Sequence, residues 1–257
     1  MKNLFFLAAA IITLTLTSCH DSIKGEGMVV TETFDLDDFD KIELQASFDV
    51  VVKQGNTQEV IVEGQQNIID RVQLDVINDN LTMYLQNGSY RNFELTVHIT
   101  SPNLDKILND GSGNITIEDF DTDNLEIIID GSGNVDATDA ITISNEMKME
   151  IDGSGDMEID DLVADEVLAI IDGSGNIEIK DGFTQDLELI CDGSGDLKIY
   201  DLESEDCIVT AKGSGDTQVK ATNTLDVQLS GSGDVKYKGN PSIDVVDTGS
   251  GDLIDAN

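Results

Sequence analysis

Residues 167–180 read VLAIIDGSGNIEIK, a segment in which every second residue on either side of a Gly-Ser-Gly triplet is apolar. The same triplet, always followed by Asn or Asp, occurs eight times at intervals of 18, 20 or 22 residues. Repeats of this length are typical of solenoids, in which each repeat forms one coil. The sequence therefore predicts an all-β parallel solenoid, or β-helix, of about 20 residues per coil with a Gly-Ser-Gly corner in each coil. The first glycines of the triplets are Gly111, Gly131, Gly153, Gly173, Gly193, Gly213, Gly231 and Gly249.

The apolar positions keep the same distance from most corners, whereas Asp247 and Asp255 replace them in the C-terminal coil. The apolar positions lie two, four and six residues before the first glycine and four and six residues after it, as Ile171 and Ile177 do around Gly173. Because strand residues alternate between two faces, these positions form the inward face of each coil. We expect two strands around each corner, with successive coils pairing in parallel about 4.8 Å apart.

The corners and the two cysteines of the repeat have structural interpretations. Glycine suits a sharp bend, either because the backbone angles there are unusual or because neighbouring coils approach too closely for a Cβ. Cys191 and Cys207 lie in adjacent coils, two and six residues before their corners. The offset of four residues corresponds to roughly 13 Å along the strands, too far for a disulfide. Both cysteines are expected to be small core residues.

The N-terminus carries the features of an export signal. Lys2 precedes the apolar residues 4–12, a run too short to cross a membrane, and residues 16–19 read LTSC. This resembles a bacterial lipoprotein signal, which predicts a signal peptide over residues 1–18, lipidation of Cys19 and a tether up to residue 27. The alternative is an ordinary secretory signal. The first interpretation predicts an outer membrane lipoprotein, facing either the periplasm or the cell exterior, with its lipid in the membrane.

The charge balance excludes some partners. The chain has 14 basic and 52 acidic residues and a formal net charge of −38, which repels nucleic acid and anionic lipid surfaces. Such a charge suits cations, basic protein patches or neutral glycans, and it also keeps a protein soluble.

Residues 28–100 lack the regular repeat but still indicate strands. Alternating apolar runs, such as those over residues 42–50 and 93–99, are separated by turn residues such as Gly55 and Asn56. This N-terminal irregular β segment is expected either to cap the first coil or to form coils itself, and the β-helix repeat region is expected over residues 101–257.

Several segments resemble one known family. They are FDKIEL at residues 39–44, VVVKQG at 50–55, VIVEG at 60–64, SPNL at 101–104 and the repeated Gly-Ser-Gly-Asn/Asp corners. Together they resemble the putative auto-transporter adhesins with a head GIN domain, a family found widely in lipoproteins of the Bacteroides group. The resemblance implies a right-handed parallel β-helix at the cell envelope with an adhesive role, and it brings no catalytic residues.

Acidic side chains on both sides of a corner are candidate calcium ligands, since Ca²⁺ prefers oxygen. Only two corners have a carboxylate on each side, Asp152 with Asp156 and Asp192 with Asp196. The alternative is that these side chains close the turn by accepting hydrogen bonds from nearby backbone N–H groups. No other cofactor is expected.

A second candidate site is the outward face of the strand before each corner. It carries apolar residues where solvated ones are expected, and a strand that is apolar on both faces is normally covered on both. Either residues 28–100 fold over this face, or it is a surface for self-association or for an unknown protein or glycan ligand. The residues are Ile128, Leu168, Ile170, Ile190, Ile208 and, near the C-terminus, Val246.

The sequence favours a binding protein over an enzyme. Carboxylates recur in every coil, whereas an active site breaks a repeat locally, and His98, Arg71 and Arg91 offer little to stabilise a developing negative charge. His98 is expected at the surface. The main hypothesis is a non-enzymatic envelope adhesin or surface interaction module. The alternatives are a periplasmic scaffold that self-associates into a homo-oligomer and a calcium-stabilised carbohydrate-binding or lyase-like β-helix.

Overall fold

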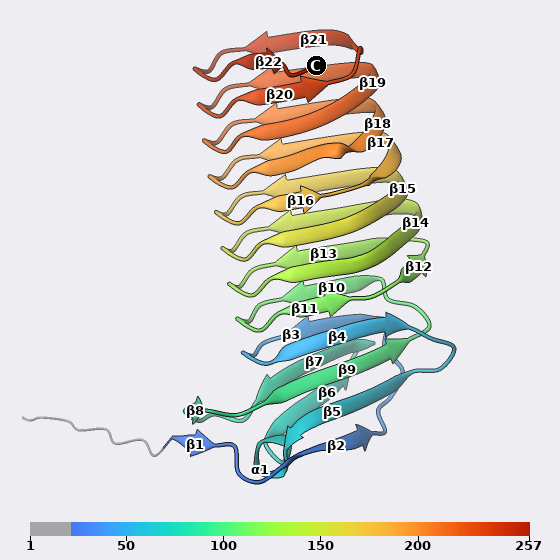
Figure 1. The fold of residues 1–257 in the computed structure, drawn as a ribbon, viewed down its shortest axis with the longest axis vertical. Helices are drawn as coiled ribbons and strands as arrows, with labels where there is room; N and C mark the ends of the chain where they lie inside the picture. Colours follow the sequence, from blue (N-terminus) through green and yellow to red (C-terminus); the bar gives the residue numbers. More distant parts are fainter. Residues whose placement is uncertain (1–21) are drawn as a thin grey trace, which may run out of the picture.

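The computed structural model describes residues 22–257, so Cys19 and the predicted signal peptide lie outside the described part. The repeat region is a column of stacked β coils whose Gly-Ser-Gly corners align along one edge (Figure 1). Its strands are β10 (Lys106–Asn109), β11 (Ile115–Ile117), β12 (Phe120–Thr122), β13 (Leu125–Ile129), β14 (Val135–Ile151), β15 (Met157–Ile171), β16 (Ile177–Ile179), β17 (Gly182–Cys191), β18 (Leu197–Ala211), β19 (Thr217–Leu229), β20 (Val235–Lys238), β21 (Ser242–Asp247) and β22 (Leu253–Asp255).

Equivalent residues of successive coils lie opposite each other in parallel strands, which confirms the predicted solenoid. Val167 of β15 pairs with Leu187 of β17, which in turn pairs with Cys207 of β18. The inward positions form one continuous apolar core, and Ile171 and Ile177 are fully buried. Cys191 and Cys207 are free thiols in this core, as expected.

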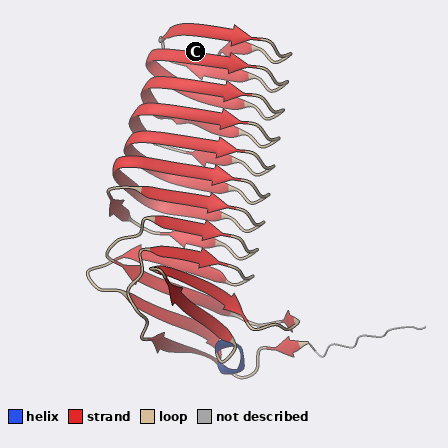
Figure 2. Ribbon diagram, turned by 180° about the vertical axis from the view of Figure 1, so that it is seen from behind, coloured by secondary structure: helices blue, strands red, loops and turns tan. Residues whose placement is uncertain are grey.

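The coils that contain β14, β15, β17 and β18 have a short third segment, so the expectation of two strands per coil was incomplete. In β15 the alternation of buried and exposed residues shifts on either side of a short third segment, in which Leu162 and Ala164 point inward. The equivalent inward residues in later coils include Thr184 and Ser204, whose polarity hides this column in the sequence. Figure 2 shows the long strands curving around the side opposite the corners.

Close approach between coils explains the corner glycines. A Cβ on Gly173 would lie 2.1 Å from the carbonyl oxygen of Gly153, and one on Gly175 would lie 1.8 Å from that of Gly155. Neither the first nor the second glycine of any triplet has a positive φ. Of the two expected reasons for glycine, the steric one therefore applies here.

The N-terminal segment extends the solenoid and then closes its end. It comprises β1 (Ile23–Lys24), β2 (Val29–Phe34), β3 (Lys41–Leu44), β4 (Asp49–Gln54), β5 (Glu59–Gln65), α1 (Gln66–Ile69), β6 (Val72–Ile77), β7 (Asn80–Leu85), β8 (Tyr90–Arg91) and β9 (Leu95–Ser101). Strands β3 and β4 pair in parallel with β10 and β11, and β7 and β9 pair in parallel with β3 and β4. Strands β6 and β5 then add antiparallel to β7 and β9, and β2 adds antiparallel to β5.

This arrangement has two consequences for the sequence-based expectations. Parallel coils begin within residues 28–100, because Ala46 and Phe48 of the β3–β4 corner pack under Gly111 and Gly113. The N-terminal segment also lies at the end of the column, so the alternative in which it folds over the outward face of the repeats is wrong. Its strands pair edge to edge with the first coil, which satisfies backbone groups that would otherwise be unpaired.

The C-terminal end of the column is more open than its middle. Ile243 and Val245 of β21 occupy inward positions, yet each is 39% exposed because no further coil within the described residues packs on them. Between residues 22 and 257, no helix is long and apolar enough to cross a membrane.

Candidate interaction surface

The structure brings four of the predicted surface residues together on the outward face of three neighbouring strands. Ile170 of β15 lies opposite Ile190 of β17, while Leu168 and Ile208 flank Glu188 in the adjacent row. Ile208 is 47% exposed, and the other three are half-buried. We call Leu168, Ile170, Ile190 and Ile208 the outer apolar strip.

Ile128 does not join this strip. Glu150 lies between Ile128 and Ile170 in the stack. Beside Ile128 the side chains form an ion-pair network, in which Glu126 contacts Lys106 at 2.9 Å and Lys148 at 2.8 Å. Partial burial opposes ionisation of Glu126, but the two ammonium groups outweigh it and lower the pKa of this carboxyl. Val246, 60% exposed on β21, also lies apart from the strip, near the C-terminal end.

Two acidic rows border the outer apolar strip. The lateral acidic row stacks in register across β14, β15, β17 and β18 and consists of Glu146, Glu166, Asp186 and Asp206. The corner acidic row precedes the first glycines and consists of Asp110, Asp130, Asp152, Asp172 and Asp192. Burial, followed by the charges of Glu150 and the stacked neighbours Asp130 and Asp172, raises the pKa of Asp152. Burial is thus the main cause of the raised pKa of Asp152, and the neighbouring carboxylates act in the same direction.

A surface groove runs between the lateral acidic row and the strip. Its lining includes Leu168 and Ile208 together with carboxylates from five strands, and it contains no basic residue. The groove thus combines exposed apolar surface with uncompensated negative charge. Its six carboxylates belong to Glu146, Glu166, Asp186, Glu188, Asp206 and Asp226.

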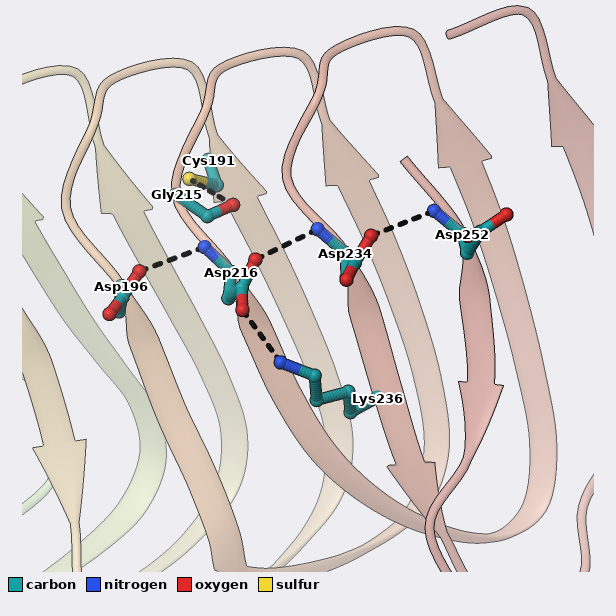
Figure 3. A network of polar contacts seen from close by, with 7 residues as sticks. All are labelled: Cys191, Asp196, Gly215, Asp216, Asp234, Lys236 and Asp252. Atoms are coloured by element: carbon teal, nitrogen blue, oxygen red, sulfur yellow. Dashed lines mark hydrogen bonds and ion pairs between the residues drawn. The ribbon is translucent and has the colours of Figure 1, made fainter. Parts of the chain in front are cut away.

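The Asn or Asp that follows each corner forms a ladder along the whole column. The side-chain Oδ1 of each accepts the backbone N–H of its counterpart in the next coil, as in the step from Asp216 to Asp234 at 2.9 Å (Figure 3). The sequence-based alternative correctly predicted that these side chains accept hydrogen bonds from backbone N–H groups. The bonds join neighbouring coils, however, and do not close a turn within one coil. The ladder consists of Asp49, Asn114, Asn134, Asp156, Asn176, Asp196, Asp216, Asp234 and Asp252.

Some oxygen atoms of the predicted calcium ligands already accept hydrogen bonds in this ladder. Oδ1 of Asp156 accepts bonds from both the backbone N–H and the side-chain amide of Asn176, each at 2.8 Å. Oδ1 of Asp196 accepts the backbone N–H of Asp216. Across residues 22–257, no three His, Cys, Asp or Glu side chains converge in a way that could hold a metal ion. Calcium binding at Asp152 and Asp156 or at Asp192 and Asp196 stays a prediction.

The residues considered for catalysis lie in the N-terminal part of the fold. His98 is in β9, with a side chain that is 39% exposed and an Nε2 atom 3.4 Å from Oε2 of Glu63. Arg91 ends the two-residue strand β8, and Arg71 follows α1. The contact between His98 and Glu63 is a surface pair, consistent with the expected position of His98.

Comparison with known proteins identifies the family. The model of the family described as putative auto-transporter adhesin, head GIN domain, matches residues 38–241. The chain belongs to this family. Two solved structures of Parabacteroides distasonis proteins, a putative adhesin and a putative lipid binding protein, share 25% and 26% identity with this family member. Their TM-scores are 0.81 and 0.82, and each comparison covers 91% of this chain and 100% of the other.

A third structure shows the same fold at lower identity. A putative adhesin from Parabacteroides merdae is 22% identical, with a TM-score of 0.81 over 91% of this chain and 100% of that protein. No curated protein matches the chain. The family and these structures confirm the predicted resemblance and fold, and they associate the fold with proteins described as putative adhesins.

The sequence identified the outer apolar strip but not the groove beside it. The lateral acidic row occupies the position seven residues before the first glycines Gly153, Gly173, Gly193 and Gly213, one step beyond the last apolar column of the aligned repeats. Extending the alignment by that step finds Glu146, Glu166, Asp186 and Asp206. The Asn or Asp after each corner was also evident in the sequence. Its hydrogen bond to the next coil could not be predicted, because it depends on how the coils stack.

Proposed function

We propose that this protein is an exported, lipid-anchored adhesin-type module that binds through the outward face of its solenoid and catalyses no reaction. The anchor is the lipidated Cys19. The expected tether up to residue 27 was too long, because Ile23 and Lys24 form β1, which pairs with β8 of the fold. Family membership supports the adhesive role. The observation that carries the proposal is the outer apolar strip, which stays uncovered although the N-terminal segment folds against the same solenoid.

The physical argument rests on how parallel sheets are normally built. A strand such as β15, with Leu168 and Ile170 outward and Val167 and Ala169 inward, is apolar on both faces and is usually covered on both. Contiguous exposed apolar residues on a folded protein mark binding surfaces. The coils that carry the strip are joined by parallel strands on all sides of the core, so the strip is held in a fixed shape before any partner arrives.

Protease treatment of intact cells tests the proposed location. We expect added protease to degrade the protein while a periplasmic marker in the same cells survives. The variant Cys19→Ser should move the protein from the membrane fraction to the soluble fraction. Survival of the wild-type protein on cells whose other surface proteins are digested contradicts an adhesive role, and an unchanged membrane fraction for Cys19→Ser contradicts the anchor.

A further inference from the structure

We propose that the groove beside the outer apolar strip binds a basic segment of a partner protein, in which Lys or Arg residues flank apolar ones. This inference rests on the proposed function and specifies the chemistry of its partner. Six carboxylates line the groove, no lysine or arginine does, and Leu168 and Ile208 form its apolar surface. A ligand that fills the groove must neutralise charge and cover apolar atoms at the same time.

The order of side chains along β15 indicates which peptide sequence would match this face. Its outward residues and the corner residue that follows them read acidic, apolar, apolar, acidic: Glu166, Leu168, Ile170 and Asp172. The first two line the groove, and the other two continue the same face toward the corner. These positions are two residues apart, about 6.8 Å, which is also the spacing of side chains on one face of an extended peptide. An extended segment with the order basic, apolar, apolar, basic therefore matches this face.

Lysine and arginine suit the edges of the groove for a second reason. Their long aliphatic stems cover apolar surface while the charged groups reach outward to carboxylates. The stems would lie on Leu168 and Ile208, and the charged groups would reach Glu166, Asp186 or Asp206, all of which border these residues. Such pairs raise the rate of association and the selectivity for basic partners.

Charge also argues against a second copy of this chain as the occupant. Two copies that met through this face would bring their lateral and corner acidic rows together, on proteins that each carry a net charge of −38. Like charges in contact are unfavourable even in water. The lining supplies no counter-charge, and Lys148 and Lys212 on the same face already contact Glu126, Glu150 and Asp192.

A peptide titration tests the inference. The probe is a fluorescent twelve-residue peptide that alternates Lys-Ile-Leu-Lys patterns on one face with serine on the other, and fluorescence anisotropy reports its binding to the mature protein. The matched peptide has Glu in place of every Lys. We expect the Lys peptide to bind, its affinity to fall about tenfold between low salt and 0.5 M salt, and the Glu peptide to show no binding.

Variants locate the binding on this face. Glu166→Gln with Asp186→Gln should weaken Lys-peptide binding at least fivefold at low salt, and Leu168→Ser with Ile208→Ser should weaken it at any salt concentration. The matched control is Glu178→Gln with Asp201→Asn, which removes the same charge from β16 and β18 beyond the corners and should leave binding unchanged.

Three outcomes overturn the inference: no binding of the Lys peptide, equal binding of the Glu peptide, or an equal loss in the control variant. Preferential binding of a neutral glycan by the same face also overturns it, because that partner needs no acidic border. If the peptide fails while intact cells still expose the protein to protease, the partner chemistry is wrong and the proposed adhesive role stands.

Discussion

Oδ1 of Asp196 accepts the backbone N–H of Asp216, one coil further along the column, at 2.8 Å. The same relationship repeats from Asp49 to Asp252, so it links the β3–β4 coil of the N-terminal segment to the last coil of the repeat. Because an Asp or Asn at this position serves the next coil and not its own, its effect on stability is an effect on stacking. Asn or Asp at this position therefore has a structural role, which is to hold neighbouring coils together.

Removing one hydrogen bond of the ladder should lower the stability of the solenoid. Asn176→Ala deletes the acceptor for the N–H of Asp196, now bonded at 2.9 Å, and should lower the free energy of unfolding by about 1 kcal/mol. Urea unfolding followed by circular dichroism measures the change. The control Ser174→Ala alters an exposed side chain at the same corner and should change stability by less than about 0.5 kcal/mol. Equal effects of the two substitutions would show that this hydrogen bond contributes nothing to the free energy of unfolding.

The corner glycines should tolerate no side chain. A Cβ on Gly193 would lie 2.0 Å from the carbonyl oxygen of Gly173, so Gly193→Ala forces two coils apart. We expect a loss of about 3 kcal/mol or more, as for severe overpacking, measured as a fall in the urea midpoint. Ser194→Ala at the same corner is the matched control and should fold like the wild type. A Gly193→Ala protein of normal stability would disprove the steric explanation.

One buried hydroxyl should be replaceable with a gain. Thr217 occupies an inward position between Leu197 and Val235, is fully buried and has no partner for its Oγ1. Thr217→Val should raise the free energy of unfolding by about 1 kcal/mol. Thr184→Val provides the contrast, because Oγ1 of Thr184 bonds to the carbonyl oxygens of Asp165 and Asp186, and it should be destabilising. Changes of the same sign at both positions would contradict this prediction.

Two aspartates should respond to pH in opposite ways. Burial and neighbouring carboxylates raise the pKa of Asp152, so its charged form opposes folding at neutral pH, and Asp152→Asn should stabilise the protein at pH 7. Lys236, followed by the backbone N–H of Asp234, lowers the pKa of Asp216, so its charged form favours folding, and Asp216→Asn should destabilise at pH 7. Asn keeps the Oδ1 acceptor in the second variant.

Unfolding at several pH values checks both signs. The gain of Asp152→Asn should shrink as pH falls through the raised pKa of the folded protein. The loss of Asp216→Asn should persist to lower pH and shrink only below the ordinary aspartate value of about 3.9. A gain for Asp152→Asn that stays constant down to pH 3 would rule out the ionisation of Asp152 as its cause.

Most of this fold can be predicted from the sequence because the repeat occurs eight times and its copies can be aligned. The inward columns around residues such as Ile171 and Ile177, the free cysteines and the parallel stacking followed from spacing alone. The short third segment was missed because its inward positions include Thr184 and Ser204, which interrupt the apolar pattern. The place of residues 28–100 could not be predicted, because β3 and β4 enter the stack between strands that come later in the chain.

The outer apolar strip could likewise be predicted only in part. Outward positions are identifiable by counting from the corner, which found Leu168, Ile170, Ile190 and Ile208. Whether another segment covers them depends on how the irregular N-terminal strands pair, and those strands carry no repeat from which to count. The separation of Ile128 from the strip depends on Glu150, which lies in the coil between Ile128 and Ile170.

The central claim is that this face mediates adhesion, and bead retention tests it most directly. Beads coated with the mature protein are washed over immobilised basic extracellular proteins, and retained beads are counted for the wild type, for Ile170→Asp with Ile190→Asp, and for Glu178→Gln with Asp201→Asn, all confirmed as folded. We predict that the wild type and the second variant are retained equally and that the Ile170→Asp, Ile190→Asp variant is lost. Equal retention of all three proteins, or of none, would contradict the claim.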